Sequence, residues 1–293
     1  MQNKGQSSPL SDWLIRLVKG ALIGIGGILP GLSGGVLAVI FGIYDRVLDF
    51  FSHITKDFWK NVQYFIPVGI GFIIGIVIFS FFVEKAFGAY EGLFTCLFIG
   101  FVVGTFPSLF REAGKEGREQ SDWLIMGVTA VLLFLLMVMG DSFLSDVAPN
   151  LFSWVLSGAL VGLGVIVPGM SPSNFLIYLG LYEPMSAGIA SFDFGVIIPL
   201  AIGGIACVLL LAKLAAWLFK RYYSRMYHFI LGTVIGSSIA IFPTVVLPAF
   251  SQEQLKAMNL SFLPAVGLAA VMFIGGIFFS LWFAGIESKY STD

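Results

Sequence analysis

An internal repeat constrains this chain more than any other feature. Residues 20–44 read GALIGIGGILPGLSGGVLAVIFGIY, and residues 158–182 read GALVGLGVIVPGMSPSNFLIYLGLY, so the two copies align without a gap from Gly20 with Gly158 to Tyr44 with Tyr182. Both copies carry Pro-Gly-x-Ser near the centre and Gly-x-Tyr at the end. Agreement over this length indicates that one ancestral unit was duplicated.

Composition places the chain in a membrane. Hydrophobic residues make up 58% of the sequence and charged residues only 11%, against about 25% charged residues in an ordinary soluble domain. We therefore predict an all-α integral membrane protein. The formal net charge of -1 provides no general attraction for polyanions, so we expect no nucleic-acid partner.

The duplication extends beyond the two matched segments. Three further apolar runs follow each segment, and landmarks in these runs also pair: Pro67 with Pro199, Gly100 with Gly236, and Gly127 with Gly267. The offset between partners changes slightly from one pair to the next, as loops of unequal length would require. We interpret residues 1–145 and 146–293 as two structural repeats that pack together as one membrane domain.

The placement of Lys and Arg predicts the topology, because cytoplasmic loops carry an excess of these residues. We take the broken segments, about residues 14–50 and 152–190, to enter and leave on one side, and the other six runs to cross once each. With the N-terminus in the cytoplasm, 14 of the 16 Lys and Arg residues are cytoplasmic, and only Lys85 and Lys256 lie outside. A single crossing by each broken segment would give nine against seven. We therefore predict a multi-pass protein with both termini in the cytoplasm.

This topology predicts that the two repeats are inverted relative to each other. Each half makes three full crossings, an odd number, so the second half starts from the opposite side of the membrane. Each arm of a broken segment has roughly 15–18 residues and would rise at most about 22–27 Å as a helix, which is short of the ~30 Å hydrocarbon core. We therefore expect six transmembrane helices plus two re-entrant helical hairpins that point at each other.

The breaks at the centres of the hairpins are where we expect function. Non-helical backbone at membrane depth is tolerated only where it is buried in protein or lines a wet cavity, and paired breaks in two halves indicate a transporter's binding site. The free N–H groups at the start of each second arm favour an anion. The hairpin breaks are Pro30, Gly31, Pro168 and Gly169. The expected anion-binding residues are Ser33, Gly34, Gly35, Ser171, Ser173 and Asn174.

Cations near the membrane are candidate partners for the same anion. An ionisable residue within a membrane segment is a functional hypothesis by default, and the candidates are Arg46, Arg111 and Lys213. Interfacial anchoring is the alternative for Arg46, since Arg and Tyr favour the membrane–water boundary. Snorkelling is the alternative for Lys213.

The two broken segments resemble the paired signatures of a known bacterial membrane family. ILPGLSGGVLAVIFGIYDRVL and VIVPGMSPSNFLIYLGLYEPM are similar to those of the polyprenyl-phosphate translocases, the PopT family, formerly domain-of-unknown-function family 368. The resemblance covers nearly the whole chain. Gly26-Gly27 and Val36 replace an Ala-Asn pair and a Thr that are usual in the first copy, whereas Asn174 is an additional donor in the second.

The resemblance implies a function. Members of this family return undecaprenyl phosphate, the lipid carrier for peptidoglycan and other envelope glycans, from the outer to the inner leaflet of the bacterial cytoplasmic (inner) membrane. It therefore implies a translocase, or flippase, that acts by alternating access on undecaprenyl phosphate or a related polyprenyl phosphate. We expect no cofactor; a coupling ion would be H+ or Na+.

Enzyme functions find less support in the sequence. The only histidines are His53 and His228, and no His/Cys/Asp/Glu cluster has the spacing of a metal site. No G-x-x-x-x-G-K-[ST] motif is present, and the G-x-S-x-G match at residues 31–35, GLSGG, lies inside the first broken segment. We therefore expect a transporter and not an enzyme. A secondary transporter or channel for a small soluble anion, built on the same helix-end chemistry, remains the alternative.

Overall fold

Six long apolar helical segments dominate the structure. The computed structural model describes residues 9–29, 34–53, 55–144, 147–167 and 172–290, and these residues form helices and turns without a strand. The segments long and apolar enough to cross a membrane are Phe58–Ala86, Tyr90–Ala113, Gln120–Gly140, Phe194–Arg221, Tyr223–Ala249 and Phe262–Trp282. They coincide with the six predicted crossings and confirm the prediction of an all-α, multi-pass membrane protein.

The crossings map onto five long helices. The first two belong to α4 (Phe58–Ala113), which is interrupted by non-helical backbone at Tyr90. The third is α5 (Gln120–Leu144), the fourth α9 (Phe194–Arg221) and the last α13 (Phe262–Tyr290). The fifth begins as α10 (Tyr223–Ile241) and continues through a π-helical turn, η1 (Phe242–Val246), into α11 (Leu247–Ala249). The short α12 (Gln252–Ala257) precedes α13.

The two broken segments contain more helices than the sequence predicts. Their first arms are α1 (Pro9–Ile28) and α6 (Leu151–Ile166). In place of a single continuous second arm, each segment has two short helices: α2 (Gly34–Ile40) and α3 (Tyr44–Ser52), then α7 (Ser173–Tyr178) and α8 (Tyr182–Ala190). The chain turns between them at Gly42 and Gly180, where φ is +67° and +66°. A right-handed helix cannot continue through such a residue, and glycine adopts this conformation without a steric penalty.

Each first arm packs closely along the first crossing of its own half. A Cβ atom at Gly20 of α1 would clash with the carbonyl oxygen of Val68 in α4, and one at Gly158 of α6 would clash with that of Leu200 in α9. Glycine is required at both positions because the two backbones touch. These contacts recur at corresponding positions of the two duplicated segments, as small residues at membrane-helix interfaces allow.

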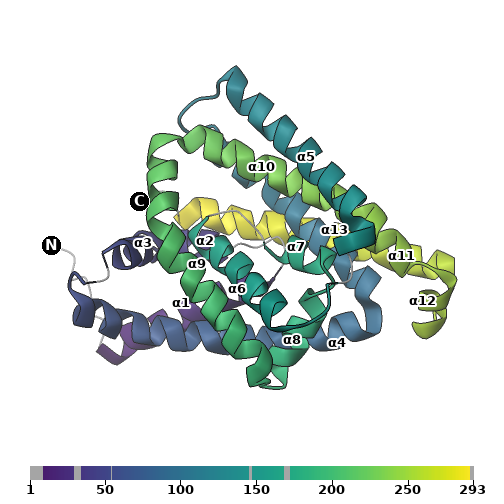
Figure 1. Cartoon of the computed structure of the whole chain (residues 1–293), viewed down its shortest axis with the longest axis horizontal. Helices are drawn as coiled ribbons and strands as arrows, with labels where there is room; N and C mark the ends of the chain where they lie inside the picture. Colours follow the sequence, from purple (N-terminus) through teal and green to yellow (C-terminus); the bar gives the residue numbers. More distant parts are fainter. Residues whose placement is uncertain (1–8, 30–33, 54, 145–146, 168–171, 291–293) are drawn as a thin grey trace.

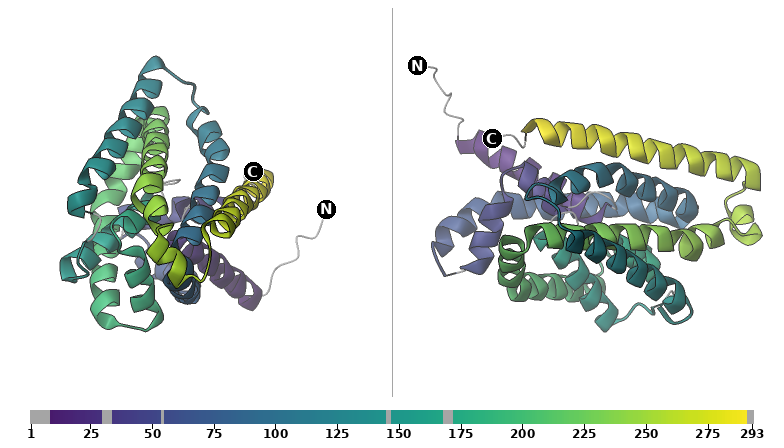
Figure 2. Two further views of the ribbon diagram at one scale, coloured as in Figure 1. Left: turned by 90° about the vertical axis from the view of Figure 1, so that its right-hand side faces the viewer. Right: turned by 90° about the horizontal axis from the view of Figure 1, so that it is seen from above.

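The third crossing of each half packs on the second crossing of the other half. A Cβ atom at Gly236 of α10 would lie 2.5 Å from the carbonyl oxygen of Ala130 in α5, and one at Gly100 of α4 would clash with the carbonyl oxygen of Phe273 in α13. Figure 1 shows α5 beside α10, and Figure 2 shows α13 along the later part of α4. The halves are therefore interlocked rather than placed side by side.

The broken segments meet at the centre of the molecule. The largest hydrophobic cluster joins the end of α1, the middle of α4 and helices α6 to α9, and it includes Ile28, Phe98, Trp154, Leu176 and Tyr182. The start of α1 and the end of α13 lie at one end of the molecule, and α11 and α12 lie at the other (Figures 1 and 2). This arrangement positions α7 and α8 against the end of α1.

Candidate functional site at the ends of the broken helices

Four of the predicted anion-binding residues lie in the described part of the chain. Gly34 and Gly35 begin α2, Ser173 and Asn174 begin α7, and all four are buried. Ser33 and Ser171 lie outside the described residues, as do the predicted breaks Pro30, Gly31, Pro168 and Gly169.

The starts of α2 and α7 both lie at the C-terminal end of α1. A Cβ atom at Gly34 would be 3.2 Å from the Cα atom of Gly27, and the Ser173 hydroxyl donates a 2.8 Å hydrogen bond to the carbonyl oxygen of Ile28. The structure therefore places Gly34 and Ser173, one residue from each copy, at the same end of α1. Helices α2 and α7 are very short, so the side-chain donors are stronger candidates for contacting an anion than the helix ends that the sequence pattern emphasised.

Two tyrosines connect the broken helices in a reciprocal way. The Tyr182 hydroxyl donates to the carbonyl oxygen of Ile28, the last residue of α1, at 3.0 Å. The Tyr44 hydroxyl donates to the carbonyl oxygen of Ile166, the last residue of α6, at 2.8 Å. Carbonyl groups at a helix C-terminus lack intrahelical partners, so each tyrosine satisfies a helix end from the other copy. The two donors pair with each other in the gap-free alignment of the copies, and so do the two acceptors.

This role of the tyrosines is not evident from the sequence. Tyrosine is typical of the membrane–water interface, whereas Tyr182 is just 1% exposed. The available signal was the recurrence of Tyr at the end of both copies. A recurring residue indicates a shared role but not its partner.

Asn174 lies in a small polar cluster inside an apolar region. Its amide Nδ2 donates to Ser237 Oγ at 3.1 Å and to Ser238 Oγ at 3.4 Å. Asn174 is 4% exposed and Ser237 is 1% exposed. Ser237 is almost equally distant from the two ends of the Tyr223–Ala249 span, which places the cluster near the middle of that span.

Ser237 and Ser238 differ in their remaining hydrogen-bonding capacity. Ser237 donates to the carbonyl oxygen of Val234 at 3.3 Å. Ser238 is half-buried, and among the described residues its hydroxyl hydrogen has no acceptor. It is therefore a donor that a ligand could use. The sequence signal for this pair is two consecutive serines at the centre of an apolar run, and they lie outside the two matched segments of the repeat.

The polar cluster belongs to one copy only. In the gap-free alignment of the two copies, Gly35 and Val36 occupy the positions of Ser173 and Asn174. In the register that pairs Gly100 with Gly236, the counterparts of Ser237 and Ser238 are Phe101 and Val102, which are apolar. The duplicated framework thus carries its polar side chains asymmetrically.

The three predicted cations lie in different surroundings. The Arg46 guanidinium lies over the Tyr64 ring, 3.5 Å from its centroid, and both Nε and one terminal nitrogen lie 3.4 Å from Asn61 Oδ1. This pairing with the start of α4 fits the anchoring alternative. Arg111, near the end of α4, and Lys213, within α9, are exposed.

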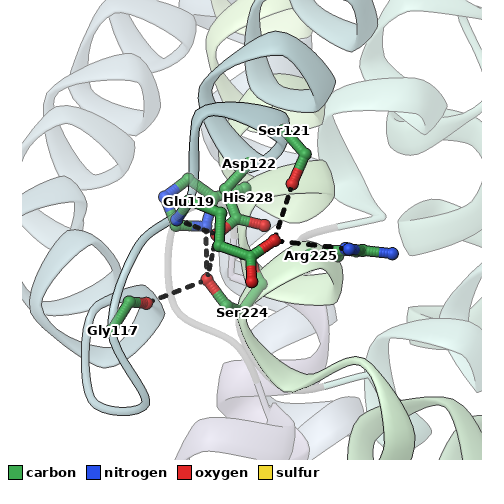
Figure 3. A network of polar contacts seen from close by, with 7 residues as sticks. All are labelled: Gly117, Glu119, Ser121, Asp122, Ser224, Arg225 and His228. Atoms are coloured by element: carbon green, nitrogen blue, oxygen red, sulfur yellow. Dashed lines mark hydrogen bonds and ion pairs between the residues drawn. The ribbon is translucent and has the colours of Figure 1, made fainter.

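A second polar cluster connects the loop before α5 to the first turn of α10 (Figure 3). Asp122 Oδ2 accepts hydrogen bonds from the Glu119 N–H at 2.8 Å and from the Ser224 hydroxyl at 2.7 Å. His228 Nδ1 donates to the Ser224 carbonyl oxygen at 2.7 Å. These hydrogen bonds hold the start of α5 against α10. Arg225 of α10 also forms an ion pair with Glu119, with the guanidinium nitrogen 3.4 Å from the carboxylate oxygen.

Two buried atoms in this cluster have no hydrogen-bond partner within the described part of the chain. They are Asp122 Oδ1 and His228 Nε2, in side chains that are 1% and 0% exposed. The His228 ring packs edge-on against Trp123, with centroids 5.9 Å apart. The sequence shows both residues but not their proximity, since they are far apart in the chain.

These features define a multi-pass helical membrane protein with paired broken helices and a polar cluster in the middle of a membrane-length span. The chain belongs to the VCA0040-like, undecaprenyl phosphate translocase-like family, whose model matches residues 23–259.

Two curated proteins illustrate the relationship. A polyprenyl-phosphate transporter of Vibrio cholerae is 24% identical over 246 residues, which cover 79% of this chain and 78% of the relative. A polyprenyl-phosphate transporter of Staphylococcus aureus is 22% identical over 245 residues, covering 78% of this chain and 86% of the relative. No solved structure gives a significant match.

Proposed function

We propose that this protein is a translocase that returns undecaprenyl phosphate from the outer to the inner leaflet of the bacterial cytoplasmic membrane. The observation that carries the proposal is the buried amide of Asn174, bonded to Ser237 and Ser238 near the middle of a membrane-length span. Polar groups at such depth are costly in hydrocarbon and are characteristic of substrate pathways. The two relatives are polyprenyl-phosphate transporters, and this supports polyprenyl phosphate as the substrate class.

The chemistry of the substrate explains why such a protein needs a polar site within the membrane. A phosphate monoester carries about -1.5 to -2 charges near neutral pH, so its passage through hydrocarbon is very unfavourable, whereas the prenyl tail can stay in lipid. The headgroup would bind near Ser33, Gly34, Gly35, Ser171, Ser173 and Asn174. Neutral donors at these positions stabilise an anion without burying a permanent charge. The remaining headgroup charge would be balanced by a cation such as Arg46 or by a coupled H+ or Na+.

Alternating access would move the headgroup between leaflets. In this mechanism, residues 1–145 and 146–293 are inverted repeats that rock against each other, with both termini in the cytoplasm and the broken segments as re-entrant hairpins. The reciprocal bonds of Tyr44 and Tyr182 support a paired motion, because each links a broken helix to the other copy. The matched glycine contacts of α1 with α4 and of α6 with α9 suggest that each first arm moves with its own first crossing.

Reconstituted vesicles test this function directly. Protein-dependent flipping of undecaprenyl phosphate should exceed that of undecaprenol, which lacks the phosphate. Asn174→Ala should slow flipping, and Asn174→Asp should slow it more because its carboxylate repels the headgroup. Asn259→Asp, at an exposed position outside the membrane-length spans, is the matched control. Equal binding of the alcohol and the phosphate, or no flipping at any pH or ion gradient, would favour the soluble-anion alternative.

A further inference from the structure

We infer that the apolar groove between α5 and α10 holds the part of the prenyl tail next to the phosphate. This assignment rests on the proposed function and adds a tail-binding site to it. It also separates a lipid substrate from a soluble anion, which has no apolar chain to place there.

The groove has a volume of about 410 Å³, within the range of about 300–1,000 Å³ found for small-molecule sites. Its lining includes Met126, Gly127 and Phe134 of α5 and Ile235, Gly236 and Ile239 of α10. The helix backbones come close where Gly236 approaches Ala130, and the groove opens at Gly127, where a Cβ atom would meet no described atom within 4 Å. Two glycines therefore shape the groove. Gly236 allows the two helix backbones to approach closely, and Gly127 leaves open space beside them.

The groove lies at the same depth as the polar cluster. Its α5 residues surround the middle of the Gln120–Gly140 span, and its α10 residues surround the middle of the Tyr223–Ala249 span. Residues 126–134 of α5 rise by about 12 Å, enough to follow a short stretch of an extended chain. A ligand in the groove would therefore lie alongside the proposed headgroup site.

Ser238 connects the two sites. It lies one helical turn after Ile235 and directly before Ile239, on the adjoining side of α10. Its hydroxyl accepts from Asn174 on one side, and no acceptor for its own hydrogen lies within the described part of the chain. A phosphate at Ser238 with its tail along Ile235 and Ile239 would satisfy the polar and the apolar parts of one molecule.

The groove lining favours a hydrocarbon ligand. All the residues that line it are apolar, and Val131 and Ile239 are 58% and 55% exposed. Covering such side chains with an isoprenoid tail is favourable by about 0.8 kcal/mol per buried methylene group in water, but lipid chains compete for the same surface in a membrane. Selectivity must therefore come from the covalent connection between the tail and a phosphate at Ser238.

A chain-length comparison tests the assignment. Purified full-length protein in lipid nanodiscs would be titrated with undecaprenyl phosphate and with dimethylallyl phosphate, whose single isoprene unit is too short to fill the groove. Gly127→Leu places a side chain at the groove, and its Cβ atom would meet no described atom within 4 Å. We expect it to weaken binding of undecaprenyl phosphate about tenfold, or about 1.4 kcal/mol, because the Leu side chain occupies the place of the tail, and to leave dimethylallyl phosphate binding unchanged. Gly69→Leu is the matched control, since it also lies in a membrane-length helix with open space at its Cβ.

Photolabelling provides an independent readout. A benzophenone-tailed prenyl phosphate should label residues 126–134 and 235–239, and undecaprenyl phosphate should compete while phosphatidylglycerol should not. Equal competition by phosphatidylglycerol, or normal undecaprenyl phosphate binding by Gly127→Leu, would overturn the groove assignment alone. Failure of the unmodified protein to bind either prenyl phosphate would instead contradict the proposed function.

Discussion

The hydroxyl of Tyr182 donates a hydrogen bond to the carbonyl oxygen of Ile28, although 154 positions separate them in the sequence. Ile28 ends α1, and its carbonyl oxygen also accepts from Ser173. Two donors from the second copy thus satisfy one helix end of the first. A buried carbonyl without any donor would be strongly unfavourable, so this contact couples the stability of the two copies.

Removing the two donors should have more than an additive effect. Tyr182→Phe or Ser173→Ala removes one of the two described donors to Ile28, and each should lower the free energy of unfolding by about 1 kcal/mol. The double variant removes both described donors and should cost about 1 kcal/mol beyond the sum. A double-mutant cycle in detergent micelles measures this coupling, with the exposed Tyr90→Phe as control. Strict additivity would show that the two bonds act independently.

Alanine at closely packed glycines should be far more damaging than alanine at open ones. A Cβ at Gly24 would clash with the carbonyl oxygen of Phe72, whereas one at Gly69 would meet no described atom within 4 Å. Gly24→Ala should lower the free energy of unfolding by about 1–3 kcal/mol. Gly69→Ala should be neutral or stabilise the helix by up to about 1 kcal/mol. Thermal unfolding followed by circular dichroism decides the matter, and equal midpoints would contradict the close approach of α1 to α4.

The pH dependence of stability should contain a contribution from Glu183 in α8. Burial, followed by repulsion from the Glu84 carboxylate, raises the pKa of Glu183. A raised carboxyl pKa destabilises the folded state once the group ionises, so the penalty is absent below the unfolded-state pKa and complete above the folded-state pKa. Glu183→Gln should therefore raise the unfolding midpoint at about pH 7.5, and its advantage should shrink as the pH falls towards 4. The exposed Glu253→Gln is the control, and a constant advantage across this pH range would refute the account.

The Asp122 carboxylate should control local opening at the start of α5. Asp122→Ala removes the acceptor of both the Glu119 N–H and the Ser224 hydroxyl. The Glu119 amide should then exchange its hydrogen at least about tenfold faster, the equivalent of about 1.4 kcal/mol. Hydrogen–deuterium exchange measured by mass spectrometry on peptides containing residue 119 tests this expectation. Unchanged exchange relative to the exposed Glu253→Ala control would mean that Asp122 does not hold this turn.

The crossings could be predicted from the sequence because each depends on a long apolar run. The second arms could not, because Gly42 and Gly180 are ordinary glycines in the sequence and only their positive φ angles in the structure show that a helix ends there. At the candidate anion site, the position of Asn174 next to the Pro-Gly-x-Ser motif of the second copy predicted it as a binding residue. Its partners Ser237 and Ser238 lie far along the chain and became evident only when α7 and α10 were brought together.

The interlocked packing of the crossings also bears on how the protein is made. The face of α4 that carries Gly100 is covered by α13, which leaves the ribosome after the other five membrane-length segments. While the second half is still being synthesised, that glycine-rich face can contact only lipid or another protein. The nascent chain therefore reaches its closed form late, and a chain released before Phe262 would present an unfinished helix surface to the proteases that survey the membrane.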